Sequence, residues 1–176
     1  MTTTTSTQPL RSRDIPPAEP PSRVQKAQQR IARWLAAHSV SALRISLGLV
    51  ILGFGALKYV PGASPAEGLA MQTTEALTFG LVSGTAAVVA TAMVETLIGL
   101  VLLSGRFLRV GLIAMAGWLG GILAPVVLFP DQMFPGGLPT LAAQYVLKDI
   151  ILVAAAAVVA AHALGARFVA PTSVRR

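Results

Sequence analysis

The residues that could do chemistry in this sequence are the few ionisable side chains within or beside its long apolar segments. They comprise an arginine, a glutamate, two lysines, an aspartate and a histidine: Arg44, Glu95, Lys58, Lys148, Asp149 and His162. Because charge is costly inside a membrane, such groups are expected to face partners in a helix bundle. A polar seam of this kind could bind a small polar ligand, move protons or hold a quinone headgroup. In a purely structural role, the same charges would lock the helices together.

The elements that position these residues are predicted from the composition. Of the 176 residues, 54% are hydrophobic and 12% are charged, and the mean hydropathy is +0.69. Soluble domains carry about 25% charged residues, so this composition indicates a membrane protein. Apolar segments in a bilayer must satisfy their own backbone hydrogen bonds, which favours helices. We therefore predict an all-α polytopic membrane protein, a four-transmembrane-helix bundle with both termini cytoplasmic.

Four apolar segments are long enough to span a bilayer. The predicted spans cover approximately residues 40–60, 81–103, 108–129 and 141–164. Together they form a predicted membrane domain at residues 39–168.

The flanking segments have a different composition. Residues 1–21 are rich in Thr, Ser and Pro and predict a disordered tail, because they offer little apolar surface to bury. Residues 22–38 predict a basic amphipathic juxtamembrane helix, and residues 169–176 a cytoplasmic tail. The basic helix is expected to bind an anionic inner leaflet through four regularly spaced side chains. These are Arg23, Lys26, Arg30 and Arg33.

The distribution of basic residues predicts the orientation of the spans. Lys and Arg occur in the N-terminal arm, in the central turn at Arg106 and Arg109, and in the C-terminal tail. The other two connections, at residues 61–80 and 130–143, contain no Lys or Arg. Cytoplasmic flanks of membrane helices are enriched in these residues, so both termini and the central turn are predicted to be cytoplasmic.

The depth of each charge in its span predicts two pairs. At about 1.5 Å per residue, Arg44 lies about 6 Å and Glu95 about 14 Å inside the inner boundary, which favours an inner Arg44–Glu95 pair. Lys58 and Asp149 both lie near the outer boundary, which favours an outer pair. The alternative for Lys58 and Lys148 is that they extend outward to the headgroups. His162, fourteen residues after Lys148 on the last span, is expected to face the inner layer.

The connections and glycines carry further signals. Ser64-Pro65-Ala66-Glu67 has the form of a capping box and predicts a short helix from Pro65 to about Leu77 along the outer surface. Pro125 is expected to kink or end the third span. Gly48 and Gly55 lie near the face of the first span that carries its charges, where small residues allow another helix to approach.

Several classes of function are disfavoured. The chain has no Cys, which excludes disulfides and thiolate chemistry. The net charge of +7 flanks the spans and does not alternate with aromatic residues, so nucleic-acid binding is not predicted. A bis-histidine haem at His38 and His162 is disfavoured, because no haem signature accompanies them. No metal spacing occurs, no catalytic residue is identified, and Trp118 is expected to serve packing.

Short motifs in this chain resemble the YkgB-type proteins of the DoxX-like family. They are Arg44-Ile45-Ser46-Leu47-Gly48-Leu49-Val50, Phe54-Gly55-Ala56-Leu57-Lys58-Tyr59, Ala66-Glu67-Gly68, Leu138-Pro139-Thr140-Leu141 and Gln144-Tyr145-Val146-Leu147-Lys148-Asp149. The resemblance implies a four-helix protein of the bacterial inner membrane, linked to quinone-coupled or oxidative-stress redox assemblies.

The resemblance leaves several roles open. We expect an accessory subunit that is not an enzyme on its own, since the chain has neither a cysteine nor a second catalytic domain. No cofactor is evident, and quinone enters only by analogy with the family. The alternatives are a small oligomeric transporter or proton-conducting protein, and a structural membrane partner. A redox partner subunit or a homo-oligomer is the expected assembly.

Overall fold

The computed structural model describes residues 22–167. The chain divides into two compact units, Met1–Leu35 and Ala36–Arg176. The predicted tails at 1–21 and 169–176 lie outside the described residues. Within the described part, the regular structure is helical and contains no strand, as the composition predicts.

Four helical segments in the described chain are long and apolar enough to cross a membrane. The first is helix α1 (Arg23–Leu57) and the second is α3 (Gly84–Ser104). The third joins α4 (Leu108–Leu123) to α5 (Pro125–Leu128), and the fourth joins α7 (Leu141–Lys148) to α8 (Ile150–Ala163). These four segments coincide to within a few residues with the predicted spans, except that the first predicted span is the C-terminal part of a longer helix.

Helix α1 is continuous from Arg23 to Leu57, so the same helix contains the basic segment and the first apolar segment. In the first unit its apolar side chains are exposed, including Val24, Ile31 and Trp34. Binding of this segment to a lipid surface stays a prediction.

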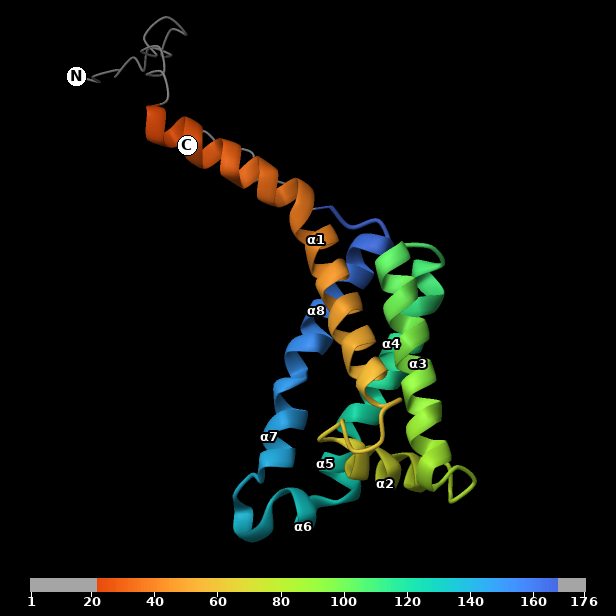
Figure 1. The fold of residues 1–176 in the computed structure, drawn as a ribbon. Helices are drawn as coiled ribbons and strands as arrows, with labels where there is room; N and C mark the ends of the chain where they lie inside the picture. The colour runs from red at the N-terminus through yellow and green to blue at the C-terminus, as the bar shows by residue number, and fades with distance from the viewer. Residues whose placement is uncertain (1–21, 168–176) are drawn as a thin grey trace, which may run out of the picture. The chain divides into compact units, whose positions relative to one another are not determined.

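The predicted helix after the first span is confirmed as α2 (Glu67–Leu77), but its predicted capping box is wrong. The N-cap residue is Ala66, which makes no side-chain cap. The Glu67 carboxylate instead accepts a hydrogen bond from the Gly62 N–H at 2.9 Å, because the preceding turn brings that donor within its reach. Helix α2 packs on α3, α4 and α5, where it lies across their ends (Figure 1).

Proline and threonine residues set the remaining helix boundaries. Pro125 begins α5 immediately after α4, so the predicted interruption of the third span is confirmed. The connection to the last span contains α6 (Pro130–Met133) and the short 3₁₀ helix η1 (Pro135–Gly137). Thr140 then caps α7, because its hydroxyl accepts the Ala143 N–H at 3.2 Å.

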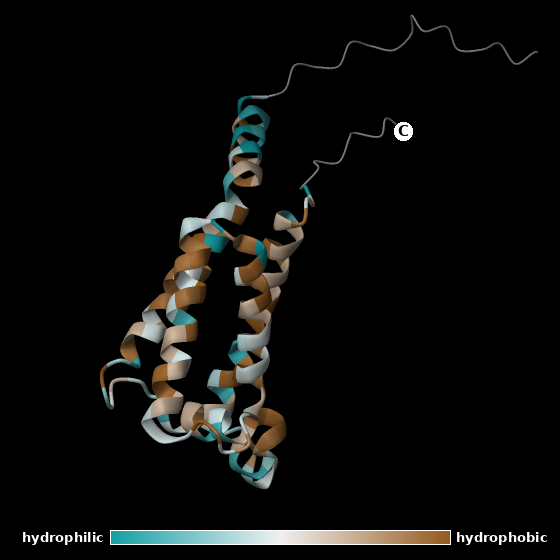
Figure 2. Ribbon diagram, turned by 90° about the vertical axis from the view of Figure 1, so that its right-hand side faces the viewer, coloured by the Kyte–Doolittle hydropathy of each residue, from teal (hydrophilic) through white to brown (hydrophobic). Residues whose placement is uncertain are grey.

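The core of the second unit draws on all four long helices. Its buried apolar residues come in pairs from α1, α3 and α4 and singly from α8: Leu47, Ile51, Ile98, Leu102, Met115, Leu119 and Val159. Many other large apolar side chains are exposed, and hydrophobic residues recur along the length of these helices (Figure 2). A hydrophobic outer surface of this kind is what a lipid-facing bundle presents.

Helices α1 and α3 approach closely at three glycines. A Cβ atom at Gly99 would lie 2.8 Å from the Leu52 Cβ and 3.0 Å from the Gly48 carbonyl oxygen. One at Gly48 would lie 2.9 Å from the Leu103 Cγ, and one at Gly55 the same distance from the Glu95 Cβ. Only glycine permits this spacing, so the prediction that Gly48 and Gly55 admit a neighbouring helix is confirmed.

We predict that Gly99→Ala destabilises the protein although alanine is the better helix former. The clash with Gly48 backbone and Leu52 should cost about 1–3 kcal/mol through overpacking, more than the propensity gain of about 1 kcal/mol. The matched control is Gly117→Ala on α4, where an added Cβ meets nothing within 4 Å. Thermal unfolding in detergent should show a lower Tm for Gly99→Ala only. Equal Tm values for the two variants would contradict the close approach.

Candidate functional site

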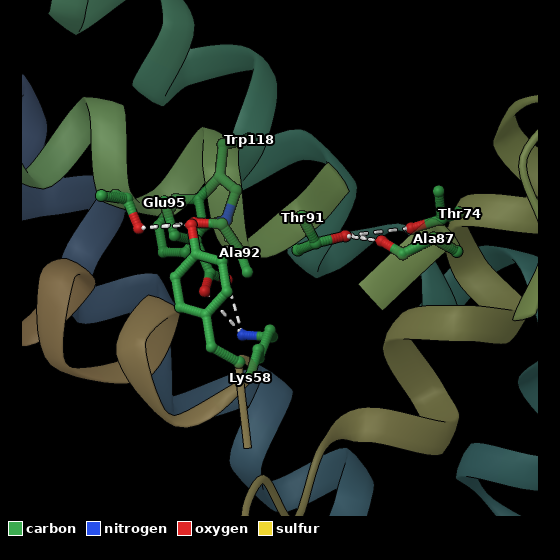
Figure 3. A network of polar contacts seen from close by, with 9 residues as sticks. Lys58, Thr74, Ala87, Thr91, Ala92, Glu95 and Trp118 are labelled. Carbon is green, nitrogen blue, oxygen red and sulfur yellow. Dashed lines mark hydrogen bonds and ion pairs between the residues drawn. The ribbon is translucent and has the colours of Figure 1, made fainter. Parts of the chain in front are cut away.

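The most deeply buried charges in the described chain form an ion pair between Lys58 and Glu95. The Lys58 Nζ lies 2.7 Å from both Glu95 Oε1 and Oε2 (Figure 3). Only 8% of Lys58 and 2% of Glu95 are exposed. Moving either ion alone from water to such a site costs several kcal/mol, so the two charges depend on each other.

Local structure at the end of α1 places Lys58 within reach of Glu95. Lys58 directly follows the last residue of α1, and its N–H donates to the Gly55 carbonyl at 3.1 Å in a tighter turn. Glu95 lies near the middle of α3. Because Gly55 lets the two backbones approach, the long lysine side chain can extend back into the bundle and reach the carboxylate.

Trp118 of α4 is the third member of this centre. Its indole Nε1–H donates to Glu95 Oε1 at 3.1 Å. An indole N–H that is half-buried needs an acceptor, and here the carboxylate provides it. The expectation that Trp118 serves packing did not include this hydrogen bond. The sequence could have indicated this hydrogen bond, since Trp118 and Glu95 carry polar groups within two consecutive apolar spans.

The carboxylate of Glu95 is thus occupied by protein donors on both oxygens. Helices α1, α3 and α4 are joined through this one side chain. Charge-assisted hydrogen bonds of this kind are about twice as strong as neutral ones and hold fixed geometry. Chemically, the arrangement fixes helices relative to one another, and it could also hold or exchange a proton between Lys58 and Glu95.

Hydroxyl groups lie beside the ion pair on two sides, and sequence reasoning did not identify them. The Tyr59 hydroxyl lies 3.1 Å from the Thr96 Oγ1. One turn before Glu95, the Thr91 hydroxyl lies 3.3 Å from the Thr74 Oγ1 of α2 (Figure 3). The spacing of Thr91 and Glu95, four residues apart on one helix, is the pattern that could have indicated a shared face.

The structure contradicts both predicted ion pairs. Glu95 pairs with Lys58, so neither the Arg44–Glu95 pair nor the Lys58–Asp149 pair forms. Arg44 Nη1 instead donates to the Leu102 carbonyl, with a longer contact of 3.4 Å to the Leu103 carbonyl. The last carbonyls of a helix have no partner within it and attract a cation, which explains why Arg44 binds the end of α3.

The Lys148-Asp149 pair does not join the buried centre. Lys148 is exposed, and its Nζ lies 4.2 Å from the centre of the Tyr145 ring, a cation–π contact. Asp149 is half-buried at the junction of α7 and α8, where its backbone carbonyl accepts the Leu152 N–H at 2.9 Å. These two residues therefore lie apart from Lys58.

His162 lies with Arg44 at a second polar location. Both side chains line a cavity of about 250 Å³ at the α3–α4 end of the second unit. The His162 Nδ1 is buried and has no hydrogen-bond partner within the part of the chain that the structure describes. Among residues 22–167, no group of three or more His, Asp or Glu side chains is arranged to hold a metal ion.

Comparison of the chain with protein-family models, with curated proteins and with solved structures finds no match.

We predict that Glu95→Gln lowers the free energy of unfolding by about 3–5 kcal/mol, because it leaves the buried Lys58 cation unpaired. Adding Lys58→Met should restore much of this loss, since the double variant buries no charge. Asp149→Asn is the control and should change stability by less than about 0.5 kcal/mol, because Asp149 has no part in the pair. Unfolding of the wild type, Glu95→Gln, Lys58→Met and the double variant in detergent gives the coupling energy. A purely additive double variant would contradict the pairing.

Proposed function

We propose that this chain is an accessory, non-enzymatic subunit of a redox or oxidative-stress-linked assembly in a bacterial inner membrane. The resemblance to YkgB-type proteins of the DoxX-like family supports the redox assignment. The observation that carries the accessory role is the saturation of Glu95 by Lys58 and Trp118. A carboxylate that is fully bonded within its own chain favours a role in holding helices together over a role in binding substrate.

The apolar surface supports the idea of a membrane partner. Large side chains on α3 and α4 are exposed along their length, among them Leu97, Val110 and Ile113. In a bilayer this surface is covered by lipid or by another subunit. The proposed partner is a redox subunit or a second copy of this chain.

The proposed orientation places both termini and the α3–α4 turn in the cytoplasm. The support is the positive charge at that turn, at Arg106 and Arg109, against the absence of Lys and Arg in connections 61–80 and 130–143. The basic start of α1 would then bind anionic lipid of the inner leaflet.

A second candidate function is proton conduction. The observation that favours it is the row of polar side chains along α3, in which Thr91, Glu95 and Thr96 each contact a polar group from another segment of the chain. Hydroxyl and carboxyl groups in succession are the components from which proton relays are built.

The double variant Lys58→Met/Glu95→Gln separates these functions. If the centre is structural, the double variant should accumulate in membranes and support survival after peroxide exposure as the wild type does, in source cells lacking the chromosomal copy. Glu75→Gln, on α2 outside the centre, is the matched control. If Glu95 carries protons, the double variant should accumulate but lose function. Proton flux into proteoliposomes that contain the wild-type chain alone, absent from the double variant, would overturn the accessory role.

The orientation can be tested by single-cysteine labelling, because the chain has no cysteine of its own. Gln132→Cys, in the connection before the last span, should react with a membrane-impermeant maleimide in intact spheroplasts. Ser104→Cys, at the α3–α4 turn, should react only after permeabilisation. Both residues are exposed in the structure, so access does not depend on unfolding. The reverse labelling pattern would place the termini outside.

A further inference from the structure

The cavity at the α3–α4 end combines polar donors with apolar walls. Its polar lining consists of Ser41, Arg44 and His162, and its apolar lining of Val40, Leu108 and Val159. These residues come from α1, α4 and α8. Neither member of the Lys58–Glu95 pair lines it, so it is a separate site.

Arg44 keeps donors available for a ligand. A guanidinium has five N–H donors, and Arg44 directs only Nη1 to the Leu102 and Leu103 carbonyls. In the described part of the chain, Nε and Nη2 donate to no protein acceptor. Gly105 also lines the cavity, and a Cβ there would lie 2.6 Å from Nη1 and 3.6 Å from Nη2. Glycine at this turn therefore leaves space around the guanidinium.

His162 adds an unsatisfied polar atom. Its Nδ1 is buried and has no hydrogen-bond partner within residues 22–167. Leaving a buried donor or acceptor unpaired costs free energy, so each such atom calls for an explanation. A bound acceptor in the cavity would provide the missing partner when the ring turns toward it.

The charge around the cavity favours an anion. None of the residues that line it is acidic. Arg106 and Arg109 are the chain neighbours of the lining residues Gly105 and Leu108. A concave site bordered by charge of one sign concentrates ligands of the opposite sign.

From these observations we propose that the cavity binds a phosphate group, held by the Arg44 guanidinium with His162 and Ser41 as further donors. Arginine matches phosphate geometry because its planar donors can bind two oxygens at once. The volume of about 250 Å³ lies below the range of about 300–1,000 Å³ typical of drug-sized ligands, so it suits a headgroup better than an entire cofactor.

Two kinds of ligand could supply this phosphate group. One is the headgroup of an anionic lipid, whose glycerol would lie against Val40, Leu108 and Val159. The other is soluble phosphate. This inference goes beyond the proposed function and does not depend on it.

The test uses the full-length protein in detergent with three probes: phosphatidylglycerol, phosphatidylcholine and inorganic phosphate. A ligand that binds only the folded state raises Tm in proportion to its occupancy, and native mass spectrometry counts bound lipid. Phosphatidylglycerol should raise Tm more than phosphatidylcholine. Equal protection by inorganic phosphate would identify the soluble ligand as the source, and no protection by it would identify the lipid.

The decisive variant is His162→Ala, because the His162 Nδ1 makes no hydrogen bond that the change would remove. It should weaken binding of the stabilising probe by about tenfold, the loss expected for one hydrogen bond to a charged group. Arg44→Gln should abolish binding. If Arg44→Gln unfolds because it loses the contact with α3, His162→Ala still tests the proposal.

A control separates the cavity from general attraction of anionic lipid to the basic start of α1. The four-site variant R23Q/K26Q/R30Q/R33Q should keep the full Tm shift. The proposal is overturned if that variant loses the shift while His162→Ala keeps it. It is also overturned if phosphatidylcholine protects as well as phosphatidylglycerol, or if no probe stabilises the protein.

Discussion

The ion pair between Lys58 and Glu95 is the interaction on which the packing of the second unit depends. Both charges are buried, and a buried charge without a partner is strongly destabilising, so each requires the other at hydrogen-bond distance. That distance can be met only if α1 and α3 approach closely, which Gly48, Gly55 and Gly99 allow. Trp118 then joins α4 to the same carboxylate. The ion pair therefore depends on the glycines, because they allow the close approach of α1 and α3 that brings the two charges together.

A second polar contact anchors the C-terminal end of α3. Arg44 binds the carbonyls of Leu102 and Leu103, which accept no hydrogen bond from a backbone N–H of their own helix. With Lys58 near one end of the apolar part of α1 and Arg44 near the other, the two contacts define the register of α1 against α3. The remaining donors of Arg44 lie at the cavity shared with His162, so one residue serves both packing and the proposed ligand site.

This division of roles bears on the proposed function. The carboxylate of Glu95 is bonded on both oxygens, whereas the cavity at the α3–α4 end is lined by His162, whose Nδ1 has no hydrogen-bond partner within residues 22–167. The buried ion pair therefore joins helices, and the cavity with the remaining Arg44 donors lies near the helix ends. The proposed accessory role and the proposed ligand site thus rest on different features of the structure.

The sequence by itself determined the helical class and the four apolar spans, because hydropathy and helix length are properties of consecutive residues. It also indicated the interruption at Pro125 and the helix that became α2. It did not determine which charges pair. Counting residues gives the height of a backbone atom along its helix, but partner choice depends on helix rotation, close approach at glycine and side-chain reach. Only the tertiary structure decided that Lys58 reaches inward to Glu95 while Arg44 binds the end of α3, because it places the unpaired carbonyls of that helix end within reach of Arg44.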